Sequence, residues 1–337
     1  MNKLISLLIA ASLLGLLIWN PYPFKILELS TFDYLMSKSP TIQNENILLV
    51  DLDEEIVKAY GGYPLPRSLF ASMIENTEGV SGLTLLMPDP DLRDNRNDYK
   101  LASAMSVKPT VLAYTASTQA TESGPHVGTA QLGENPLPWL LNYQGILRQL
   151  PVLQLNAGGV GLINSSPELD GVVRRMPVAV SSGDKIYPSF PLEMLRLAVG
   201  DPSYQIKTNE TGVEWLRVPS YPTITTDANA RIWVQQNVKF HRQTASQYMQ
   251  NPIPAPFVIF GVTAEGVTNP VPTAQGAVYP HEIQANVLHS LIEGNSPSIP
   301  TWSVAVELGA ALLALLLLWI TASRIWLSLP VLALTIG

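Results

Sequence analysis

The chain has 337 residues, no cysteine and a formal net charge of −7. Its charged fraction is 14%, below the about 25% of typical soluble domains, whereas its hydrophobic fraction reaches 47%. The lack of cysteine excludes disulfides, thiolate metal ligands and cysteine nucleophiles. The negative charge, without a basic stripe, argues against a nucleic-acid partner.

The first predicted element is a membrane span near the amino terminus. Leu4–Trp19 is an apolar run directly after Lys3, and at 1.5 Å per residue it covers about 24 Å of a hydrocarbon core about 30 Å thick. A cleaved signal peptide is the alternative, but such a peptide ends in a small-residue site, and a proline-rich stretch follows here instead. We therefore expect an uncleaved signal anchor over residues 1–22, and then a helix at Phe24–Ser37.

The next part of the chain alternates between strand-like and helix-like segments. Short apolar runs predict strands at 46–52, 82–87 and 110–114, and the segments between them predict helices at 66–78 and 97–106. This order, with short connections, predicts an α/β fold with a mixed, mainly parallel sheet and helices on its faces. We expect one such domain over residues 23–300, flanked by transmembrane helices.

The second half of this domain follows a long polar stretch at 116–157. Strands are expected at 159–164 and 172–180, with Asp170-Gly171 as a hairpin turn between them. The remaining segments predict a helix at 188–199, strands at 213–218, 231–234 and 257–260, and a helix at 280–293. Gly294 suits the left-handed position that ends a helix.

Apolar residues return near the carboxyl terminus. Trp302–Ile320 predicts a second span within residues 301–321, and residues 325–337 resemble the start of a further span that is too short to cross. Lys3 and Arg324 flank the two longer runs, so the positive-inside rule places both in the cytoplasm and the main domain outside it.

Several polar residues lie where ligands bind in parallel sheets. Asp51 and Asp53 close the first predicted strand, and the carboxyl ends of such strands face the usual ligand crevice. The alternative is that one caps a turn and the other faces solvent. A third possibility is an exported hydrolase with paired carboxylates, which requires an apolar cleft and one raised pKa.

Three other motifs are interpreted as structural. The aspartates of Asp89–Asp98 do not match an EF-hand loop, so a solvated loop is expected, with Asp98 near a helix start. Gly158–Asn164 lacks the third glycine of a phosphate loop, which favours close strand packing. His281–Glu282 and the pair His289 and Glu293 do not complete a zinc site, so capping or exposure is expected, and no metal or cofactor is predicted.

The pair Arg174 and Arg175 follows the predicted turn. Neighbouring residues of a strand point to opposite faces, so only one arginine can face a given surface. One is expected to pair with a carboxylate at the sheet end, Asp51 or Asp53, and the other is expected to be solvated.

Several segments together resemble a known family. They read LLVDLDEEI, YPLPRSLFASMIE, GVGLINSSPELDGVVRRMPV, YPSFPLEMLRLAVG and VYPHEIQANVLHSLIEG in this order. They resemble the second class of CHASE-type sensor domains, the cyclase/histidine-kinase-associated sensory extracellular family of bacteria, over residues 25–300. The resemblance implies a periplasmic α/β input module of a multi-pass inner-membrane protein. It also implies a cytoplasmic output domain, which is an adenylate or diguanylate cyclase or a protein kinase.

The chain departs from this family at three positions. Leu86 stands where an aspartate usually ends the second strand, Gln284 where a histidine is usual, and Asn269 where an aspartate is usual. If these groups form a polar site in the family, that site is altered here.

The leading hypothesis is a membrane-anchored sensory domain without enzymatic activity of its own, acting as a homodimer on an unknown small-molecule or periplasmic signal. An exported scaffold that senses nothing is the alternative. Because they cluster at strand ends or helix starts, the candidate ligand contacts are Asp51, Asp53, Arg67, Asn164, Asp170, Arg175, Glu282 and Gln284.

Overall fold

The computed structural model describes residues 15, 21–119, 127–294, 296 and 302–321. These residues form two compact units, one made of Met36–Pro297 and one made of Met1–Leu35 with Ser298–Gly337.

The second of these units contains two described helices, each matching a predicted one. Helix α2 (Tyr22–Ser37) begins in this unit and covers the helix expected after the first span, and α10 (Ser303–Thr321) covers the second apolar run. Within the described residues, no helix meets the combined requirement of length and apolar character for crossing a membrane. Of the predicted anchor at residues 1–22, all but Gly15, Pro21 and Tyr22 lie outside the described residues, as does the predicted span at 325–337.

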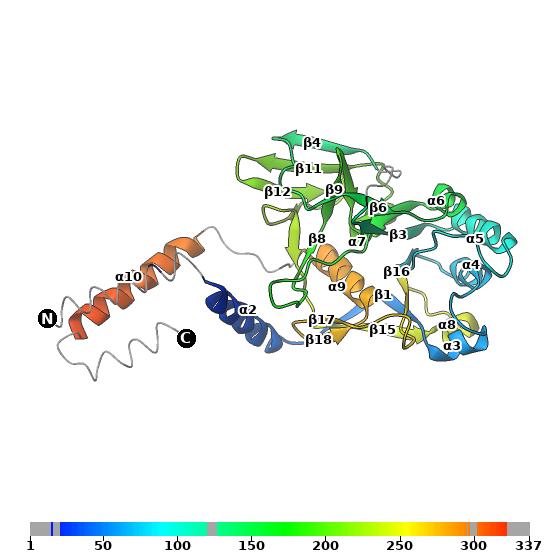
Figure 1. Ribbon diagram of the computed structural model, residues 1–337, viewed down its shortest axis with the longest axis horizontal. Coiled ribbons are helices and arrows are strands. Elements are labelled where there is room, and N and C mark those ends of the chain that lie inside the picture. Colours follow the sequence, from blue (N-terminus) through cyan, green and yellow to red (C-terminus); the bar gives the residue numbers. More distant parts are fainter. Residues whose placement is uncertain (1–14, 16–20, 120–126, 295, 297–301, 322–337) are drawn as a thin grey trace. The chain divides into compact units, whose positions relative to one another are not determined.

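The Met36–Pro297 unit is built around a seven-stranded sheet (Figure 1). Its parallel strands lie in the order β15 (Val238–Thr244), β1 (Ile42–Leu52), β16 (Phe257–Val262), β2 (Val80–Leu83), β3 (Thr110–Ser117) and β7 (Gly159–Leu162). Strand β6 (Gly145–Leu147) pairs antiparallel with the end of β3. The predicted α/β class with a mainly parallel sheet is therefore confirmed for this unit.

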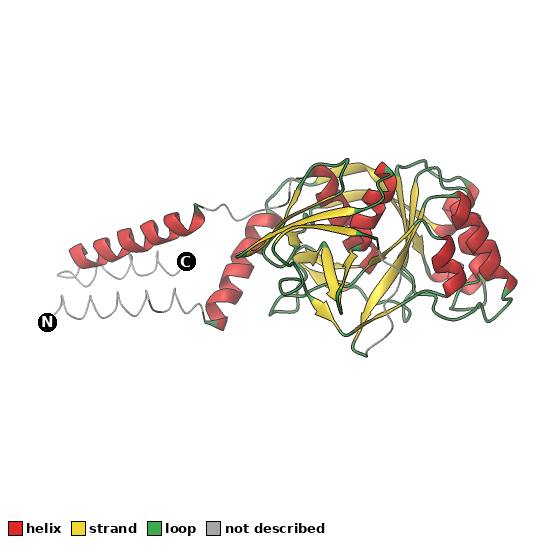
Figure 2. Ribbon diagram, turned by 90° about the horizontal axis from the view of Figure 1, so that it is seen from above, coloured by secondary structure: helices red, strands yellow, loops and turns green. Residues whose placement is uncertain are grey.

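Helices cover both faces of the sheet (Figure 2). One face carries α4 (Arg67–Glu75), α5 (Arg96–Val107), α6 (Pro151–Asn156) and α8 (Ala245–Gln250), and the other carries α7 (Phe190–Val199) and α9 (Pro280–Glu293). The short helix α3 (Glu54–Ala59) follows β1 directly. A strand between two helical layers must be apolar on both sides, which explains the uninterrupted run Ile47–Val50.

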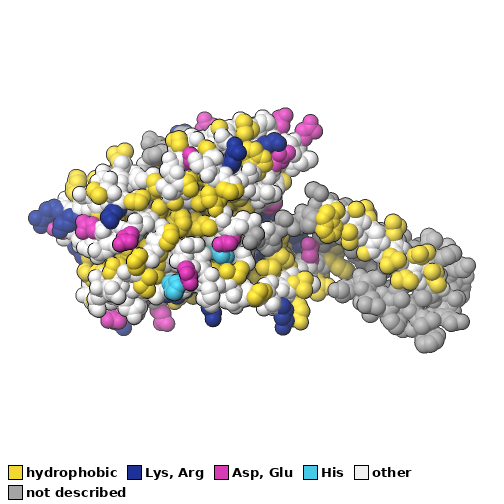
Figure 3. Space-filling view, turned by 180° about the vertical axis from the view of Figure 1, so that it is seen from behind, with side chains coloured by type: hydrophobic (Ala, Val, Ile, Leu, Met, Phe, Trp, Pro, Cys, Tyr) yellow, Lys and Arg dark blue, Asp and Glu magenta, His cyan; other side chains and the backbone are white. Residues whose placement is uncertain are grey.

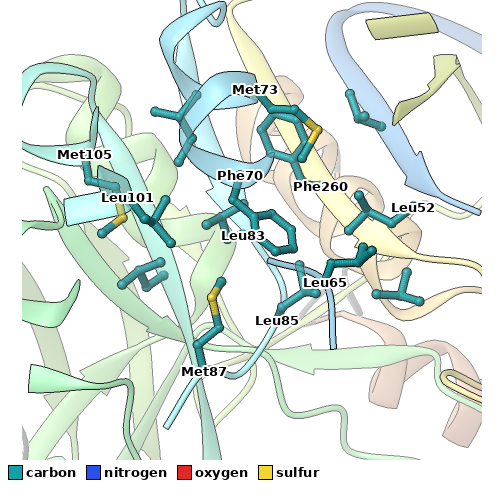
Figure 4. Packing of buried hydrophobic residues seen from close by; sticks show 14 of the residues in the cluster. Leu52, Leu65, Phe70, Met73, Leu83, Leu85, Met87, Leu101, Met105 and Phe260 are labelled. Carbon is teal, nitrogen blue, oxygen red and sulfur yellow. The ribbon is translucent and has the colours of Figure 1, made fainter. Parts of the chain in front are cut away.

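The two-residue period of β1 divides the core into two clusters. Leu48 and Val50 belong to the cluster on the side of α4, α5 and α8, whereas Ile47 and Leu49 belong to the cluster on the side of α7 and α9, and all four are fully buried. Figure 4 shows part of the first cluster, in which Phe70 of α4 lies among side chains from β2, β16 and α5.

Smaller sheets complete the unit. A four-stranded sheet has the order β13 (Ile224–Thr225), β12 (Gly212–Arg217), β11 (Tyr204–Asn209) and β4 (Thr129–Gly133). The others pair β10 (Lys185–Pro188), β9 (Ala179–Ser182) and β5 (Asn142–Tyr143), then β14 (Arg231–Trp233) with β8 (Arg175–Pro177), and β17 (Val271–Thr273) with β18 (Gly276–Val278). On the face of this unit seen in Figure 3, hydrophobic side chains form a band across the middle, between the more polar upper and lower parts.

Two strand predictions are corrected. The hairpin expected between 159–164 and 172–180 does not form, because β7 pairs with β3 of the main sheet and β8 pairs with β14. Asp170-Gly171 still turns the chain, since the Gly171 N–H donates to the Glu168 carbonyl at 2.9 Å and Gly171 has φ +80°. The predicted strand at 172–180 is split into β8 and β9.

The glycine-rich segment before this turn serves close packing, as predicted. A Cβ on Gly161 of β7 would lie 2.4 Å from the Cα of Phe190 at the start of α7. The segment therefore lets α7 approach the sheet and forms no phosphate loop.

Candidate functional site

The carboxyl edge of the parallel sheet carries a connected group of polar side chains. Asp51 lies near the end of β1, Arg242 lies on the neighbouring strand β15, and His281 and Glu282 lie in the first turn of α9. These four residues are called the Asp51 network below.

The contacts within the Asp51 network are short and directional. The Arg242 guanidinium donates to both carboxylate oxygens of Asp51, at 3.0 and 3.1 Å, and its third nitrogen donates to Oε2 of Glu282 at 2.6 Å. Nε2 of His281 lies 2.8 Å from Oδ1 of Asp51. One arginine thus bridges two acids from elements far apart in the sequence, which locks the start of α9 against β1 and β15.

Local backbone features bring these side chains together. Asp51 follows Leu49 by two residues, so it points to the α9 face of the sheet, and Arg242 pairs in register with Leu49. Gly261 of β16 lies beneath the imidazole, and a Cβ there would lie 2.2 Å from Cγ of His281. The glycine therefore creates the space that the histidine fills.

The electrostatics of the network favour an ionised carboxylate. Burial opposes the charged form of Asp51, but the hydrogen bonds from His281 and Arg242 and the charge of Arg242 outweigh it, so its pKa lies below its ordinary value. For Arg242, burial also opposes the charge, but Asp51 and Glu282 outweigh it and raise the pKa. The network is thus a charge-paired unit in which the carboxylate stays ionised.

His281 has one unused polar atom. Its side chain is 1% exposed, and its Nδ1 has no hydrogen-bond partner among the described residues. His281 was expected to cap a helix or be exposed, and neither is the case, because its ring reaches Asp51 and Gly261 leaves room for it. The described residues contain no group of three or more histidine or acidic side chains placed to hold a metal ion.

Two more predicted site residues lie at the same edge. Nε2 of Gln284 donates to the carbonyl of Ile163 at 3.0 Å, just after β7. The neighbouring Asn164 accepts from the N–H of Ala116 at 2.6 Å and from the Thr115 hydroxyl at 3.2 Å. Both side chains therefore join the ends of β3, β7 and α9, and their bonds are internal to the protein.

Asp53 has a local role. It is the N-cap of α3 and accepts a hydrogen bond from the N–H of Ile56 at 3.1 Å. The alternative considered above, that one of the two aspartates caps a turn, therefore holds for Asp53. Neither aspartate supports the paired-carboxylate hydrolase, because Asp53 caps α3 and Asp51, whose pKa is lowered, is held by Arg242 and His281.

Arg67 lies in a separate cluster beyond the end of β2. Its backbone N–H donates to Oδ2 of Asp91 at 2.8 Å, its Nη2 donates to the carbonyl of Asp89 at 3.1 Å, and its Nε lies 3.7 Å from Oδ1 of Asp98. The expected solvated loop is therefore only partly correct, since Asp91 and Asp98 are buried while Asp89 is exposed. Burial follows because these two carboxylates accept the loop's own N–H groups. Asp98 lies in the first turn of α5, as predicted.

A cleft of about 160 Å³ opens beside Arg67. It is called the Arg67 cleft below. Its walls come from the segment before α4, from the first turn of α4 and from the segment after β2. Its lining includes Arg67, Phe70, Leu86, Met87 and Asp89.

Asp170 and Arg175 belong to a third cluster, away from Asp51. Arg174 is 2% exposed and binds both oxygens of Asp170, at 2.9 and 2.7 Å. Arg175 binds both oxygens of Glu168, at 2.6 and 2.9 Å, and its guanidinium lies 5.0 Å from the ring centre of Trp233.

The expected pairing of one arginine with Asp51 or Asp53, and solvation of the other, are therefore wrong. The turn at Asp170-Gly171 brings Asp170 and Glu168 next to the two arginines, so local acids satisfy both guanidinium groups.

Sequence reasoning missed Arg242 and His281, which complete the Asp51 network. Arg242 follows a run of mixed polar and aromatic residues with little strand signal, so nothing in the sequence placed it beside β1. The one available signal for His281 was its position at the start of a predicted helix, where side chains meet the carboxyl edge of a sheet.

Comparison with known proteins agrees with the resemblance seen in the motifs. The family model of the CHASE2 domain matches residues 7–322. No curated protein and no solved structure matches the chain. Since the match covers most of the chain, this protein belongs to the CHASE2 domain family, a family of bacterial extracellular sensory domains.

Proposed function

We propose that this chain is the membrane-anchored, extracytoplasmic input module of a bacterial signalling protein of the inner membrane. It binds a small-molecule or periplasmic signal as a homodimer and relays the change through transmembrane helices to a cytoplasmic cyclase or kinase. The observation that carries the proposal is the CHASE2 match over residues 7–322.

Two features of the chain support the membrane anchoring. Apolar runs stand on both sides of the folded unit in the sequence, at Leu4–Trp19 and Trp302–Ile320. Lys3 and Arg324 lie on the outer sides of these runs, which fits a main domain outside the cytoplasm.

The arrangement at the carboxyl edge supports a relay. The Asp51 network joins β1, β15 and α9, and α9 ends at Gly294, a few residues before the second apolar run. A signal can act through this route only if it binds two conformations of the unit with different affinity. We propose that the candidate contacts at this edge, Asp51, Glu282, Gln284 and Asn164, take part in that change.

The absence of cysteine makes the topology directly testable. A single cysteine at the exposed position Asp184 is expected to react with a membrane-impermeant maleimide in intact cells whose outer membrane is permeabilised. A matched cysteine at Asn2 is expected to react only after lysis. Protection of Asp184→Cys in intact cells would place the domain in the cytoplasm and remove the proposal.

A second experiment separates sensing from scaffolding. The chain is joined in frame to a diguanylate cyclase, and the cyclic dinucleotide is measured while candidate signals are added. A scaffold gives constant output, whereas a sensor gives output that changes with one signal and stays constant with others.

A further inference from the structure

The Arg67 cleft combines apolar walls with two opposite charges. Phe70 and Met87 are buried side chains of the first core cluster, and Figure 4 shows them converging beside Leu65 and Leu85, which line the same cleft. Arg67 and Asp89 are its charged lining residues. The cleft thus lies beyond the carboxyl end of β2, the edge where parallel sheets bind ligands.

Arg67 keeps unused hydrogen-bonding capacity. Its side chain is 9% exposed, yet the bond to the Asp89 carbonyl is its one side-chain hydrogen bond to a described residue. A guanidinium has five N–H donors, and Nη1 of Arg67 makes no hydrogen bond with a described residue, whereas the enclosed Nε faces Oδ1 of Asp98. Because Arg67 lines the cleft, an acceptor that enters it can take a hydrogen bond from the donors that remain.

The surrounding charges restrict which acceptor fits. Asp98 lies 3.7 Å from Nε of Arg67, and Asp89 lines the cleft with a carboxylate that no described residue binds. A simple anion would meet these acids, and a simple cation would meet Arg67. A molecule that carries both charges close together can place its carboxylate at Arg67 and its ammonium group at Asp89.

Size and polarity define the rest of the ligand. A cavity of about 150 Å³ is large enough to hold benzene, and this cleft has about the same volume. Leucine, proline and aromatic side chains form most of its lining, which suits an aliphatic group. We propose that the Arg67 cleft binds a small zwitterion with an aliphatic side chain, of the α-amino acid class, and that this is the signal of the sensor, a step that rests on the proposed function.

Binding of L-leucine to the purified full chain, measured by titration calorimetry, tests the site. We expect saturable binding that weakens at least about tenfold for 4-methylpentanoate, which lacks the ammonium group, and for 3-methylbutylamine, which lacks the carboxylate. Failure of L-leucine to bind at millimolar concentration, or equal binding of all three molecules, would overturn the assignment.

Variants separate the cleft from a general loss of structure. Asp89→Asn is expected to weaken L-leucine at least about tenfold while binding 4-methylpentanoate as tightly as the parent or more tightly, a difference that misfolding cannot produce. Leu86→Trp, which fills the cleft, is expected to abolish binding of both. Asp94→Asn, on the same loop but outside the lining, is the matched control and is expected to bind like the parent. Equal weakening of both probes by Asp89→Asn would refute the charge pairing.

The binding and signalling experiments can distinguish a failure of the cleft assignment from a failure of the proposed sensory function. If L-leucine binds but the fused cyclase does not respond to it, the cleft stands as a binding site and its role in signalling is refuted. If the cyclase responds to another signal while L-leucine does not bind, the sensory role stands and the cleft assignment is refuted.

Discussion

Nε2 of His281 lies 2.8 Å from Oδ1 of Asp51, although the two residues are 230 positions apart in the chain. This contact joins the last helix of the folded unit to its first strand. It is made inside a network in which Arg242 also binds Asp51 and Glu282. The position of α9 relative to the sheet is therefore fixed by these charged side chains in addition to its apolar packing, and their contribution can be measured.

Replacing Asp51 by asparagine removes the charge that His281 and Arg242 share. Because hydrogen bonds to charged groups contribute about 1.5–3 kcal/mol each, we expect the free energy of unfolding to fall by about that amount. Chemical denaturation of the full chain measures the change, with the exposed Asp184→Asn as control. A decrease no larger than that of the control would show that the network does not stabilise the fold.

The same carboxylate predicts loss of stability in acid. The pKa of Asp51 is lower in the folded protein than its ordinary value of 3.8. The unfolded chain therefore takes up the proton first, so this stabilisation is complete above about pH 4 and is lost as the pH falls through the folded pKa. The free energy of unfolding is measured between pH 5 and pH 2 at intervals of about one pH unit. It is expected to fall less steeply with decreasing pH in Asp51→Asn than in the parent.

His289 predicts a second pH dependence, at higher pH. Burial lowers its pKa from 6.5, Glu293 opposes the shift only partly, and Nδ1 of His289 lies 2.8 Å from Nδ2 of Asn44. Its folded pKa lies below the unfolded one, so stability is complete above pH 6.5 and falls below it, by at most about 1.4 kcal/mol per pH unit. We expect His289→Gln to flatten the curve between about pH 6.5 and pH 5, and an unchanged slope would assign it to another group.

Gly261 is expected to tolerate no side chain. A Cβ there would come within 2.2 Å of the His281 ring, so Gly261→Ala must displace the start of α9 or the histidine. Overpacking of this kind costs about 1–3 kcal/mol. The melting temperature should fall, and it should remain unchanged in Gly128→Ala, where nothing lies within 4 Å. Equal melting temperatures for the two variants would contradict the close contact.

Two arginines that each bind a nearby aspartate, Arg174 and Arg96, differ in how far they are buried, and their substitutions can be compared. Arg174 is 2% exposed and binds Asp170, whereas Arg96 is 83% exposed and binds Asp94. Arg174→Ala removes the two hydrogen bonds to the Asp170 carboxylate and the packing of a fully buried side chain, so it is expected to cost about 1.5–3 kcal/mol. Arg96→Ala is expected to cause no measurable change in the denaturation midpoint, because solvent screens that pair. Equal effects of the two substitutions would refute a structural role for Arg174.

The sequence alone determined the α/β class, most helices and the family. Apolar runs of strand length, such as Ile47–Val50, can be buried on both faces only inside a layered sheet. Helix α9 ends at Gly294, where φ is +65°, because that backbone conformation favours glycine. These features depend on neighbouring residues, so they can be predicted from a short window of the chain.

Only the tertiary structure decided which charged side chains pair with one another. One of Arg174 and Arg175 was expected to reach the sheet end and the other to be solvated, but the local turn gives them Asp170 and Glu168. Arg242 takes the place beside Asp51. A charged side chain can pair with any opposite charge that the fold brings near it. The ion pairs therefore depend on which strand lies beside β1, and the order of strands in the sequence does not determine this. The insertion of β16 between β1 and β2, after more than 170 residues of intervening chain, is what brings Gly261 and hence His281 to Asp51.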